Sequence, residues 1–295
     1  MIESSNQLNA QQLQNLMQLK TKCKQVDGSV PNLYPHILVQ SRTFPVNLFY
    51  YEQDELLGFL SVFFFYDEAV EVALLVHPSA RRKGIASQLL QTIIPQVQSY
   101  GISELIFSSP THLNDSWLKN LNLVYLNSEY CMERDDLNPL LDYNQSLSFR
   151  EATAKDILIL CALDEACFPK KNAKSAERFQ QIFDDRNYQI FIVLQNNQPI
   201  GKAHLRWEHQ GVTLSDIAIL PALQAKGYGS ALIAYCVNYA LGEGKPYVSL
   251  DVETHNQRAL NLYVRLGFVV QNACDYWSIK AAALQQSLAL KSPIS

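Results

Sequence analysis

Two glycine-containing turns carry residues that could bind a polyanionic ligand. In the second turn, an apolar strand ends at Pro221 and is followed by Gly227, Gly229 and a helix expected from Ser230. Glycine lets the main chain approach a ligand closely, and the free N–H groups at the start of a helix favour anions. This combination indicates a pyrophosphate site; the alternative interpretation is a tight turn flanked by solvated cations. The pattern is neither a Walker loop nor Gly-x-Gly-x-x-Gly, so nucleotide hydrolysis and dinucleotide binding are poorly supported.

The two turns belong to an internal repeat. Three pairs of segments share an offset of 143 residues: Leu57–Gly58 with Ile200–Gly201, Val76–Pro78 with Ile219–Pro221, and Arg81–Ala86 with Gln224–Gly229. Each feature could recur by chance, but the same spacing three times indicates a duplication. We therefore expect the two halves to share one fold.

Hydrophobic periodicity predicts a similar order of elements in both halves. In the second half we expect helices over 156–167, 176–183, 230–241 and 256–266 and strands over 147–150, 189–194, 199–208, 212–220, 247–253 and 268–279. In the first half we expect helices over 11–24, 87–97 and 114–120 and strands over 46–53, 56–66, 69–76 and 105–108. Asp135–Ser146 is polar and contains Pro139, which indicates a linker. The prediction is an α/β (α+β) protein with an N-terminal domain over 1–144 and a C-terminal domain over 147–295.

The second half carries two signatures of a known family. Gln224–Gly229 fits the acetyl-CoA signature Gln/Arg-x-x-Gly-x-Gly/Ala and follows the strand Asp216–Pro221, and Asn256–Phe268 fits the second signature. The chain thus resembles the GCN5-related N-acetyltransferases (GNAT), strongly over about 147–280 and more weakly over about 1–143. As a whole it resembles tandem members such as mycothiol synthases and VipF-like bacterial effectors. The resemblance implies two tandem GNAT folds, each a mixed, mostly antiparallel sheet flanked by helices, and acetyl transfer from acetyl-CoA to an amine.

The resemblance also implies which residues hold acetyl-CoA. In the second half they are the strand residues Ile217, Ala218 and Ile219, the turn residues Gln224, Ala225, Lys226, Gly227, Tyr228, Gly229 and Ser230, and the helix residues Asn256 and Asn261. In the first half they are Leu75, Val76, Arg81, Arg82, Lys83, Gly84, Ile85, Ala86 and Ser87. The strand N–H groups at Ala218 and Ile219 would face the thioester carbonyl. Asn256 is equally suited to cap the helix that follows it.

Tyr263 is the general acid that the resemblance implies. In this family a neutral amine attacks the thioester directly, and the departing CoA thiolate takes a proton. The ordinary pKa of a tyrosine hydroxyl, about 10, is close enough to that of a thiol for this transfer. The alternative role of Tyr263 is that of a half-buried aromatic side chain on a helix.

The sequence offers two candidates for the general base but one for the acid. We name Asp251, twelve residues before Tyr263, and Asp216, which strand alternation places on the face of Leu214 and Ala218. For both, a solvated or ion-paired carboxylate is the alternative. Many family members have a glutamate where this chain has Thr213, so that base is absent. With a modest base, an α-amine is the easier acceptor, because its pKa lies closer to neutrality than that of lysine.

The two halves are not equivalent. Aligning Leu266–Phe268 with Leu121–Leu123 places Leu118 at the position of Tyr263, and leucine cannot donate a proton. Pro95 is expected to end early or kink the helix that follows the first glycine turn. The first half is therefore predicted to bind acetyl-CoA or to be structural, without catalysis. The alternative for the whole chain is an acetyl-CoA sensor or a protein-interaction module without turnover.

The composition of the chain indicates which cellular compartment and which kinds of partner to expect. The 295 residues are 48% hydrophobic with a net charge of −4, which gives no electrostatic case for nucleic-acid binding. The six cysteines form no CxxC pair or zinc spacing, so we expect reduced thiols and name no metal ligands. No signal peptide or clean membrane span is recognised. We expect a cytoplasmic protein, or alternatively a secreted bacterial effector in a host cytosol, that takes a small-molecule or protein amine and is a monomer or weak homo-oligomer.

Overall fold

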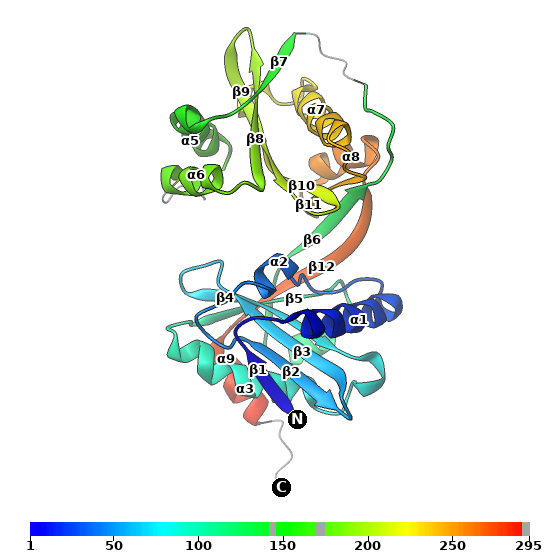
Figure 1. Cartoon of the computed structure of the whole chain (residues 1–295). Helices are drawn as coiled ribbons and strands as arrows, with labels where there is room; N and C mark the ends of the chain where they lie inside the picture. The colour runs from blue at the N-terminus through cyan, green and yellow to red at the C-terminus, as the bar shows by residue number, and fades with distance from the viewer. Residues whose placement is uncertain (142–145, 169–174, 291–295) are drawn as a thin grey trace. The chain divides into compact units, whose positions relative to one another are not determined.

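The computed structural model describes residues 1–141, 146–168 and 175–290, and these form two compact units (Figure 1). Unit 1 comprises Met1–Tyr130, Glu253–His255 and Asn272–Ser295, and unit 2 comprises Cys131–Val252 and Asn256–Gln271. Both units combine a mixed sheet with helices, which confirms the predicted α/β class.

The sheet of unit 1 is antiparallel except at one strand pair. Its strands follow the order β1–β2–β3–β4–β5, with β5 paired to the end of β12, and only the pair β4–β5 among these is parallel. The strands are β1 (Ile2–Ser5), β2 (Asn47–Glu52), β3 (Glu55–Phe63), β4 (Ala69–Val76), β5 (Glu104–Pro110), β6 (Val124–Arg134) and β12 (Val269–Lys280). The helices are α1 (Ala10–Asp27), α2 (Pro35–Leu38), η1 (Pro78–Ala80), α3 (Ile85–Ser99), α4 (Asp115–Asn120) and α9 (Ala281–Ala289).

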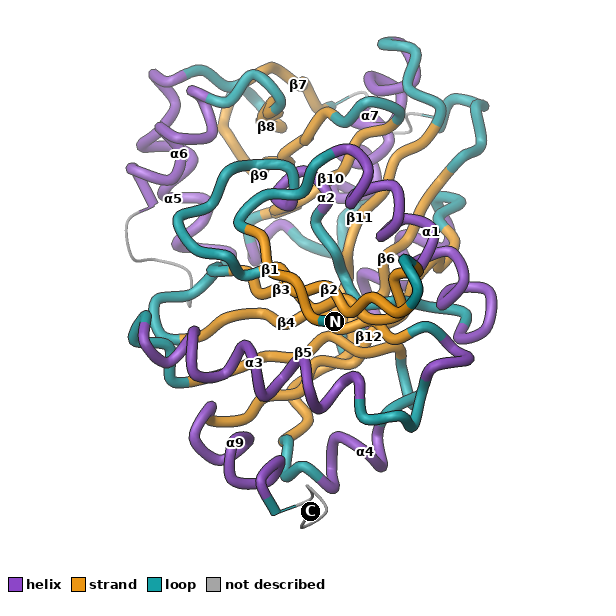
Figure 2. Tube along the Cα trace, turned by 60° about the horizontal axis from the view of Figure 1, so that its bottom comes forward, coloured by secondary structure: helices purple, strands orange, loops and turns teal. Residues whose placement is uncertain are grey.

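Helices cover both faces of this sheet (Figure 2). On one face, buried side chains of α3 and α9, such as Ile93 and Leu284, pack with Val70 and Val72 of β4. On the other face, α1 packs its buried leucines against Phe59 and neighbouring strand residues. Strand alternation therefore divides the apolar side chains of β3 and β4 between two separate cores.

Unit 2 repeats this plan with the strand order β11–β10–β9–β8–β7, in which β10 and β11 form the parallel pair. The strands are β7 (Leu147–Glu151), β8 (Tyr188–Gln195), β9 (Gln198–Trp207), β10 (Gly211–Ile219) and β11 (Tyr247–Glu253). The helices are η2 (Ala154–Asp156), α5 (Ile157–Cys167), α6 (Ser175–Asp184), η3 (Pro221–Leu223), α7 (Tyr228–Gly242) and α8 (Gln257–Arg265). Helices α5 and α6 lie on one side of β8 and β9, and α7 lies on the other (Figure 1).

The predicted repeat is confirmed by the positions of the elements. α3 and α7, like β5 and β11, have the same length and start 143 residues apart. Gly58 pairs with Val76 as Gly201 pairs with Ile219. A Cβ at Gly201 would lie 2.3 Å from the main-chain oxygen of Ala218. In unit 2 the close approach of β10 therefore requires a glycine here, whereas at Gly58 the nearest atom to such a Cβ is Ile85 Cγ2, at 2.6 Å.

Several elements differ from the sequence-based expectation. Strands β1 and β6 and helices α2 and α9 were not predicted, because they are short or lack a clear apolar period. Of the two effects predicted for Pro95, the early helix end is wrong, since α3 continues to Ser99, and the kink stays a prediction. Pro95 lies on the exposed side of α3, whereas Ile93, Ile94 and Val97 are buried, so packing of the apolar side maintains the helix through the proline.

The compact units also exchange segments relative to the predicted division at 144–147. Asn272–Ser295 belongs to unit 1, and Cys131 onwards belongs to unit 2. The reason is hydrogen bonding, because Cys274–Lys280 of β12 pairs with Pro110–Glu104 of β5 and so completes the first sheet. Residues 142–145 of the expected linker lie outside the described residues.

The cysteines and helices add two further facts. All six cysteines are free thiols, as predicted, and Cys23, Cys236 and Cys274 are buried. Among the described helices, none has both the length and the apolar character needed to span a membrane.

Helix α9 is expected to stabilise unit 1 through Leu284, whose side chain is fully buried. Leu284→Ala should lower the free energy of unfolding by about 2–5 kcal/mol, because it removes buried methyl groups and leaves a cavity. Leu290→Ala, at a side chain that is 87% exposed, is the control and should change it by less than about 0.5 kcal/mol. Urea denaturation measures both, and equal effects would contradict the packing of α9 described above.

Candidate active site

The two predicted turns have the same main-chain geometry. Gly84 and Gly227 adopt left-handed conformations, with φ of +82° and +84°, directly before α3 and α7. The first hydrogen bond of each helix closes onto this glycine, from Gln88 to Gly84 and from Ala231 to Gly227. The three N–H groups between the glycine and that donor have no acceptor within the helix. The positive-φ glycine and the free helix-start N–H groups expected from the sequence are therefore present at both turns.

A side chain at the start of each turn bonds back to the end of the preceding strand. The Arg81 Nε–H donates to the carbonyl of Val76 at 3.1 Å, and the Gln224 side-chain amide donates to the carbonyl of Ile219 at 3.0 Å. In each unit a cysteine thiol also approaches that carbonyl, Cys23 at 3.5 Å and Cys167 at 3.6 Å. These contacts fix the turn against the strand, and the cysteines were not among the predicted site residues.

The turns differ in charge. Two nitrogens of the Arg81 guanidinium bind the carboxylate of Asp27, which is 5% exposed, and this pair raises the pKa of Arg81. Arg82 and Lys83 are exposed, as is Lys226 in the second turn. Positive charge toward an anion would thus come from Arg82 and Lys83 in unit 1 and from Lys226 in unit 2.

In both units the parallel strand pair separates before its strands end. The pairing of β4 with β5 stops at Ala73–Ser108, and that of β10 with β11 stops at Leu214–Leu250. Leu75 and Val76 therefore lie in the separated part of β4, and Ile217, Ala218 and Ile219 lie in that of β10. Main-chain groups on the inner side of a separated strand lack a strand partner and are available to a ligand.

Unit 1 has a cavity of about 380 Å³ at this separation. It is lined by Arg81, Arg82 and residues 84–87 of the turn, by Leu75 and Val76 of β4, by Ser108 and Ser109 of β5, and by Trp117 and Leu118 of α4. All predicted first-half residues except the exposed Lys83 thus lie around one cavity, and Ile85, at the start of α3, is buried.

Tyr263 lies on α8 with its side chain 8% exposed, in edge contact with the ring of Phe268. Burial raises the pKa of its hydroxyl, and no side chain or main-chain group in the described part of the chain hydrogen-bonds to it. The adjacent Leu262 approaches Gly229 of the turn. α8 therefore lies against the turn that precedes α7, and Tyr263 keeps a protonated hydroxyl at neutral pH.

The predicted correspondence between Leu118 and Tyr263 agrees with the helix ends. The N–H of Leu123 bonds to the carbonyl of Leu118, just as the N–H of Phe268 bonds to that of Tyr263. Asn122 takes the left-handed conformation that Gly267 takes in unit 2, with φ of +67° and +84°. Leu118 is buried in unit 1 and has no proton to donate.

Asp251 lies on the polar face of β11, as strand alternation predicts. Although its side chain is exposed, partial burial of the carboxyl raises its pKa, while a hydrogen bond with Cys131 and the nearby Arg206 lower it. On the adjacent strand, Thr213 donates to Glu208 at 2.9 Å and lies 3.0 Å from the hydroxyl of Ser249. Asp251 thus belongs to a polar surface beside the strand separation.

The prediction that Leu214, Asp216 and Ala218 share one face is wrong, because the register shift reverses strand alternation between Leu214 and Ala218. A bulge between Ser215 and Ala218 interrupts the alternation of β10, and Asp216 has a φ of +46°. Its carboxylate accepts a hydrogen bond from Arg178 of α6 at 3.0 Å and lies 3.5 Å from Nδ1 of His204. Neither Arg178 nor His204 was predicted as a site residue, although His204 and Lys202 stand out as two ionisable residues within an apolar strand.

The two asparagines of the second signature have local partners. Asn256 caps α8 by accepting the N–H of Ala259 at 3.2 Å, and Asn261 accepts a hydrogen bond from Gln257. The capping role of Asn256 is confirmed, and a role in holding the cofactor remains a prediction for both.

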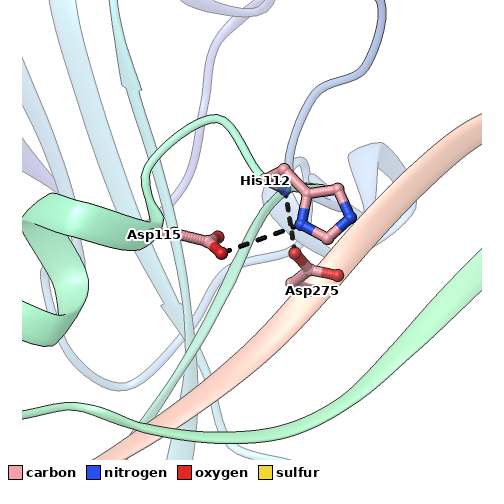
Figure 3. Close-up of side chains that lie close together, drawn as sticks. All are labelled: His112, Asp115 and Asp275. Carbon is pink, nitrogen blue, oxygen red and sulfur yellow. Dashed lines mark hydrogen bonds and ion pairs between the residues drawn. The ribbon is translucent and has the colours of Figure 1, made fainter.

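One His/Asp cluster in unit 1 has potential metal-ligand atoms within 4.8 Å of one another (Figure 3). His112 Nδ1 lies 3.7 Å from Asp115 Oδ2, and the main-chain N–H of His112 donates to Asp275 Oδ2 at 2.9 Å. The other oxygen of Asp275 accepts the hydroxyl of Ser128. The buried carboxylate thus has hydrogen-bond partners that hold the loop after β5, and we assign no metal to it.

Residues 13–116 and 157–268, which include both turns, match the model of the acetyltransferase (GNAT) family. Mycothiol acetyltransferase from Mycobacteroides abscessus is 29% identical over 213 residues, covering 67% of this chain and 70% of the relative. The match therefore extends over more than one repeat.

Two solved structures share the fold over nearly the whole chain. A GCN5-related N-acetyltransferase from Sphaerobacter thermophilus has a TM-score of 0.77 at 14% identity and covers 95% of this chain and 96% of that one. A tandem GNAT protein from the clavulanic acid biosynthesis pathway has a TM-score of 0.69 at 13% identity and covers 95% and 99%. At this level of identity the similarity concerns the fold alone.

Proposed function

The chain belongs to the acetyltransferase (GNAT) family, and from this premise we propose that unit 2 transfers the acetyl group of acetyl-CoA to an α-amine. The observation that carries the proposal is the difference between the units at one helix position. Both units have the turn and the separated strands, but only unit 2 has a tyrosine, Tyr263, where unit 1 has Leu118.

The turn residues fit the diphosphate of acetyl-CoA. The N–H groups of Tyr228, Gly229 and Ser230 have no acceptor within α7, and Lys226 adds an exposed positive charge. Anions are favoured at such a helix start. Ile217, Ala218 and Ile219 would lie beside the acyl end, and bound acetyl-CoA would supply the thioester that the amine attacks.

Tyr263 would supply the proton that the departing thiolate needs. Its raised pKa keeps the hydroxyl protonated at neutral pH, which an acid requires. Asp251 is better placed than Asp216 to accept the amine proton, because the carboxylate of Asp216 is already paired with Arg178 and His204. The raised pKa of Asp251 also makes it a stronger base than an ordinary aspartate.

Unit 1 would bind acetyl-CoA without turning it over. Its cavity of about 380 Å³ is lined by the turn residues, but the buried Leu118 lines it where a proton donor is needed. Unit 1 would then act as a sensor of acetyl-CoA attached to the catalytic unit.

Blocking each turn separately tests the cofactor sites. Calorimetric titration of acetyl-CoA into the full chain should show two sites, one lost in Gly84→Glu and the other in Gly227→Glu. Gly244→Glu is the matched control, because Gly244 also has a positive φ, +76°, and open space around it. If the chain shows one site and only Gly227→Glu removes it, unit 1 has a structural role alone. If only Gly84→Glu removes acetyl-CoA binding, the assignment of catalysis to unit 2 is wrong.

Removing the Tyr263 hydroxyl tests the acid. Tyr263→Phe should lower kcat by at least about 10²-fold, the usual contribution of a positioned acid, and leave acetyl-CoA binding unchanged. Tyr239→Phe removes a hydroxyl that bonds Gln189 on the α7 side of unit 2 and should keep full activity. Full turnover in Tyr263→Phe would refute the role of this residue.

The acceptor class is tested by a comparison of amines. Deprotonation at pH 7 costs about 4.6 kcal/mol for a lysine ε-amine but only about 1 kcal/mol for an α-amine. With an exposed aspartate as the base, kcat/KM should be higher for peptides with a free α-amine than for the same peptides with a blocked N-terminus and a free lysine. The opposite order would exclude the α-amine preference.

A further inference from the structure

We propose that a closed ring of five side chains in unit 2 positions the main chain of β10 for acetyl transfer. The ring consists of Asp164 on α5, Arg178 on α6, Lys202 and His204 on β9, and Asp216 on β10. This inference rests on the proposed catalytic role of unit 2 and adds to it residues that act through the main chain rather than on the reacting atoms.

Each member of the ring contacts two others. Lys202 Nζ lies 2.9 Å from Asp164 Oδ1 and 2.9 Å from His204 Nε2. Asp216 Oδ2 lies 3.5 Å from His204 Nδ1 and 3.0 Å from Arg178, and Arg178 also binds Asp164, which closes the ring. Because the Lys202 ammonium donates to Nε2, the proton of a neutral His204 is on Nδ1 and faces Asp216.

The ring has an unfavourable desolvation free energy, because three of its ionisable side chains are buried. The side chains of Asp164, Lys202 and His204 are at most 1% exposed. Burial lowers the pKa of Lys202, and the neighbouring carboxylates of Asp216 and Asp164 oppose this shift. Buried ionic groups are often no more stabilising than a well-packed apolar core. Their presence therefore calls for a role other than stability.

Unit 1 shows that the fold does not need the ring. By strand register, Phe59 stands at the position of Lys202 and Ser61 at that of His204, while Ser61 pairs with Ala73 and the bulge residue Asp216 has no counterpart in β4. Phe59 and Ala73 belong to the apolar core beneath α1. The unit without the tyrosine thus packs these positions with small or apolar side chains.

The ring surrounds the bulge of β10. Asp216 sits in the bulge with its left-handed φ, and the ammonium of Lys202 lies 3.5 Å from the main-chain carbonyl of Asp216. A strained conformation of this kind persists only where its surroundings fix it. In unit 1 the pairing of β3 with β4 runs from Gly58 to Phe63 without a register shift. The bulge, the ring and Tyr263 therefore occur together in unit 2.

A fixed bulge determines where the N–H groups of Ile217, Ala218 and Ile219 point. These residues follow Asp216 into the part of β10 that has separated from β11. Donors that are held in place before reaction stabilise developing charge on a carbonyl oxygen without reorganisation. Loss of the ring should therefore slow turnover more than it weakens acetyl-CoA binding.

Two substitutions of Asp216 in the full chain test this role. Asp216→Ala removes both ring contacts of the side chain and should lower kcat ten- to a hundredfold, with less than a threefold change in the KM for acetyl-CoA. Asp216→Asn keeps an acceptor oxygen for Arg178 and His204 and should retain kcat within about threefold. Equal losses in both variants would make Asp216 a base and overturn the inference, as would a kcat for Asp216→Ala within twofold of the parent.

A second variant and a control separate positioning from stability. His204→Phe breaks the ring at a buried residue and should lower kcat as Asp216→Ala does. If this variant does not fold, the comparison of Asp216→Ala with Asp216→Asn still tests the positioning role. Arg150→Met removes the ion pair of Arg150 with Asp156, elsewhere in unit 2, and should lower Tm but not kcat. If Gly227→Glu leaves turnover unchanged, the proposed function fails. If Gly227→Glu abolishes turnover while Asp216→Ala does not affect it, only the role of the ring fails.

Discussion

The early separation of the parallel strands leaves main-chain groups without a strand partner. The residues around each turn either hydrogen-bond to these groups or fix their orientation. Pairing ends at Ala73 in unit 1 and at Leu214 in unit 2, before either strand ends. A buried carbonyl without a partner is unfavourable, so the strand-end carbonyls of Val76 and Ile219 accept hydrogen bonds from Arg81 and Gln224. The first residue of the signature therefore has a structural role in each unit, since its side chain joins the turn to the end of the strand.

The two units satisfy this constraint with different chemistry. In unit 1, Asp27 pairs with the arginine that bonds the strand end, and β4 is regular, with a buried Glu71 that accepts hydrogen bonds from Tyr34. Unit 2 uses an uncharged glutamine for this bond and places ionic groups beside a bulged strand. One duplicated framework therefore supports a regular strand in unit 1 and a bulged strand in unit 2.

Local patterns predicted most of the elements and both turns, because helix periodicity, the turn glycines and the 143-residue offset are all encoded within short windows. The side on which Asp216 lies was not predictable in this way, since one extra residue in a bulge reverses strand alternation. The ring was also missed, because Asp164, Arg178 and Lys202 come from separate elements that only tertiary packing brings together. Nor does periodicity reveal that β12 pairs with β5, because apolar alternation is the same in either sheet.

Each compact unit contains segments from both halves of the chain, so neither half can be lost without damage to both units. The last strand and helix of the chain complete the first unit, and Cys131–Arg134 of β6, encoded in the first half, lie in the second unit. A gene truncated between the repeats would encode neither unit whole, so selection for one activity preserves both halves. Unit 1, which has Leu118 at the position of Tyr263, is therefore retained wherever unit 2 is selected, while the residues that line its cavity remain free to change.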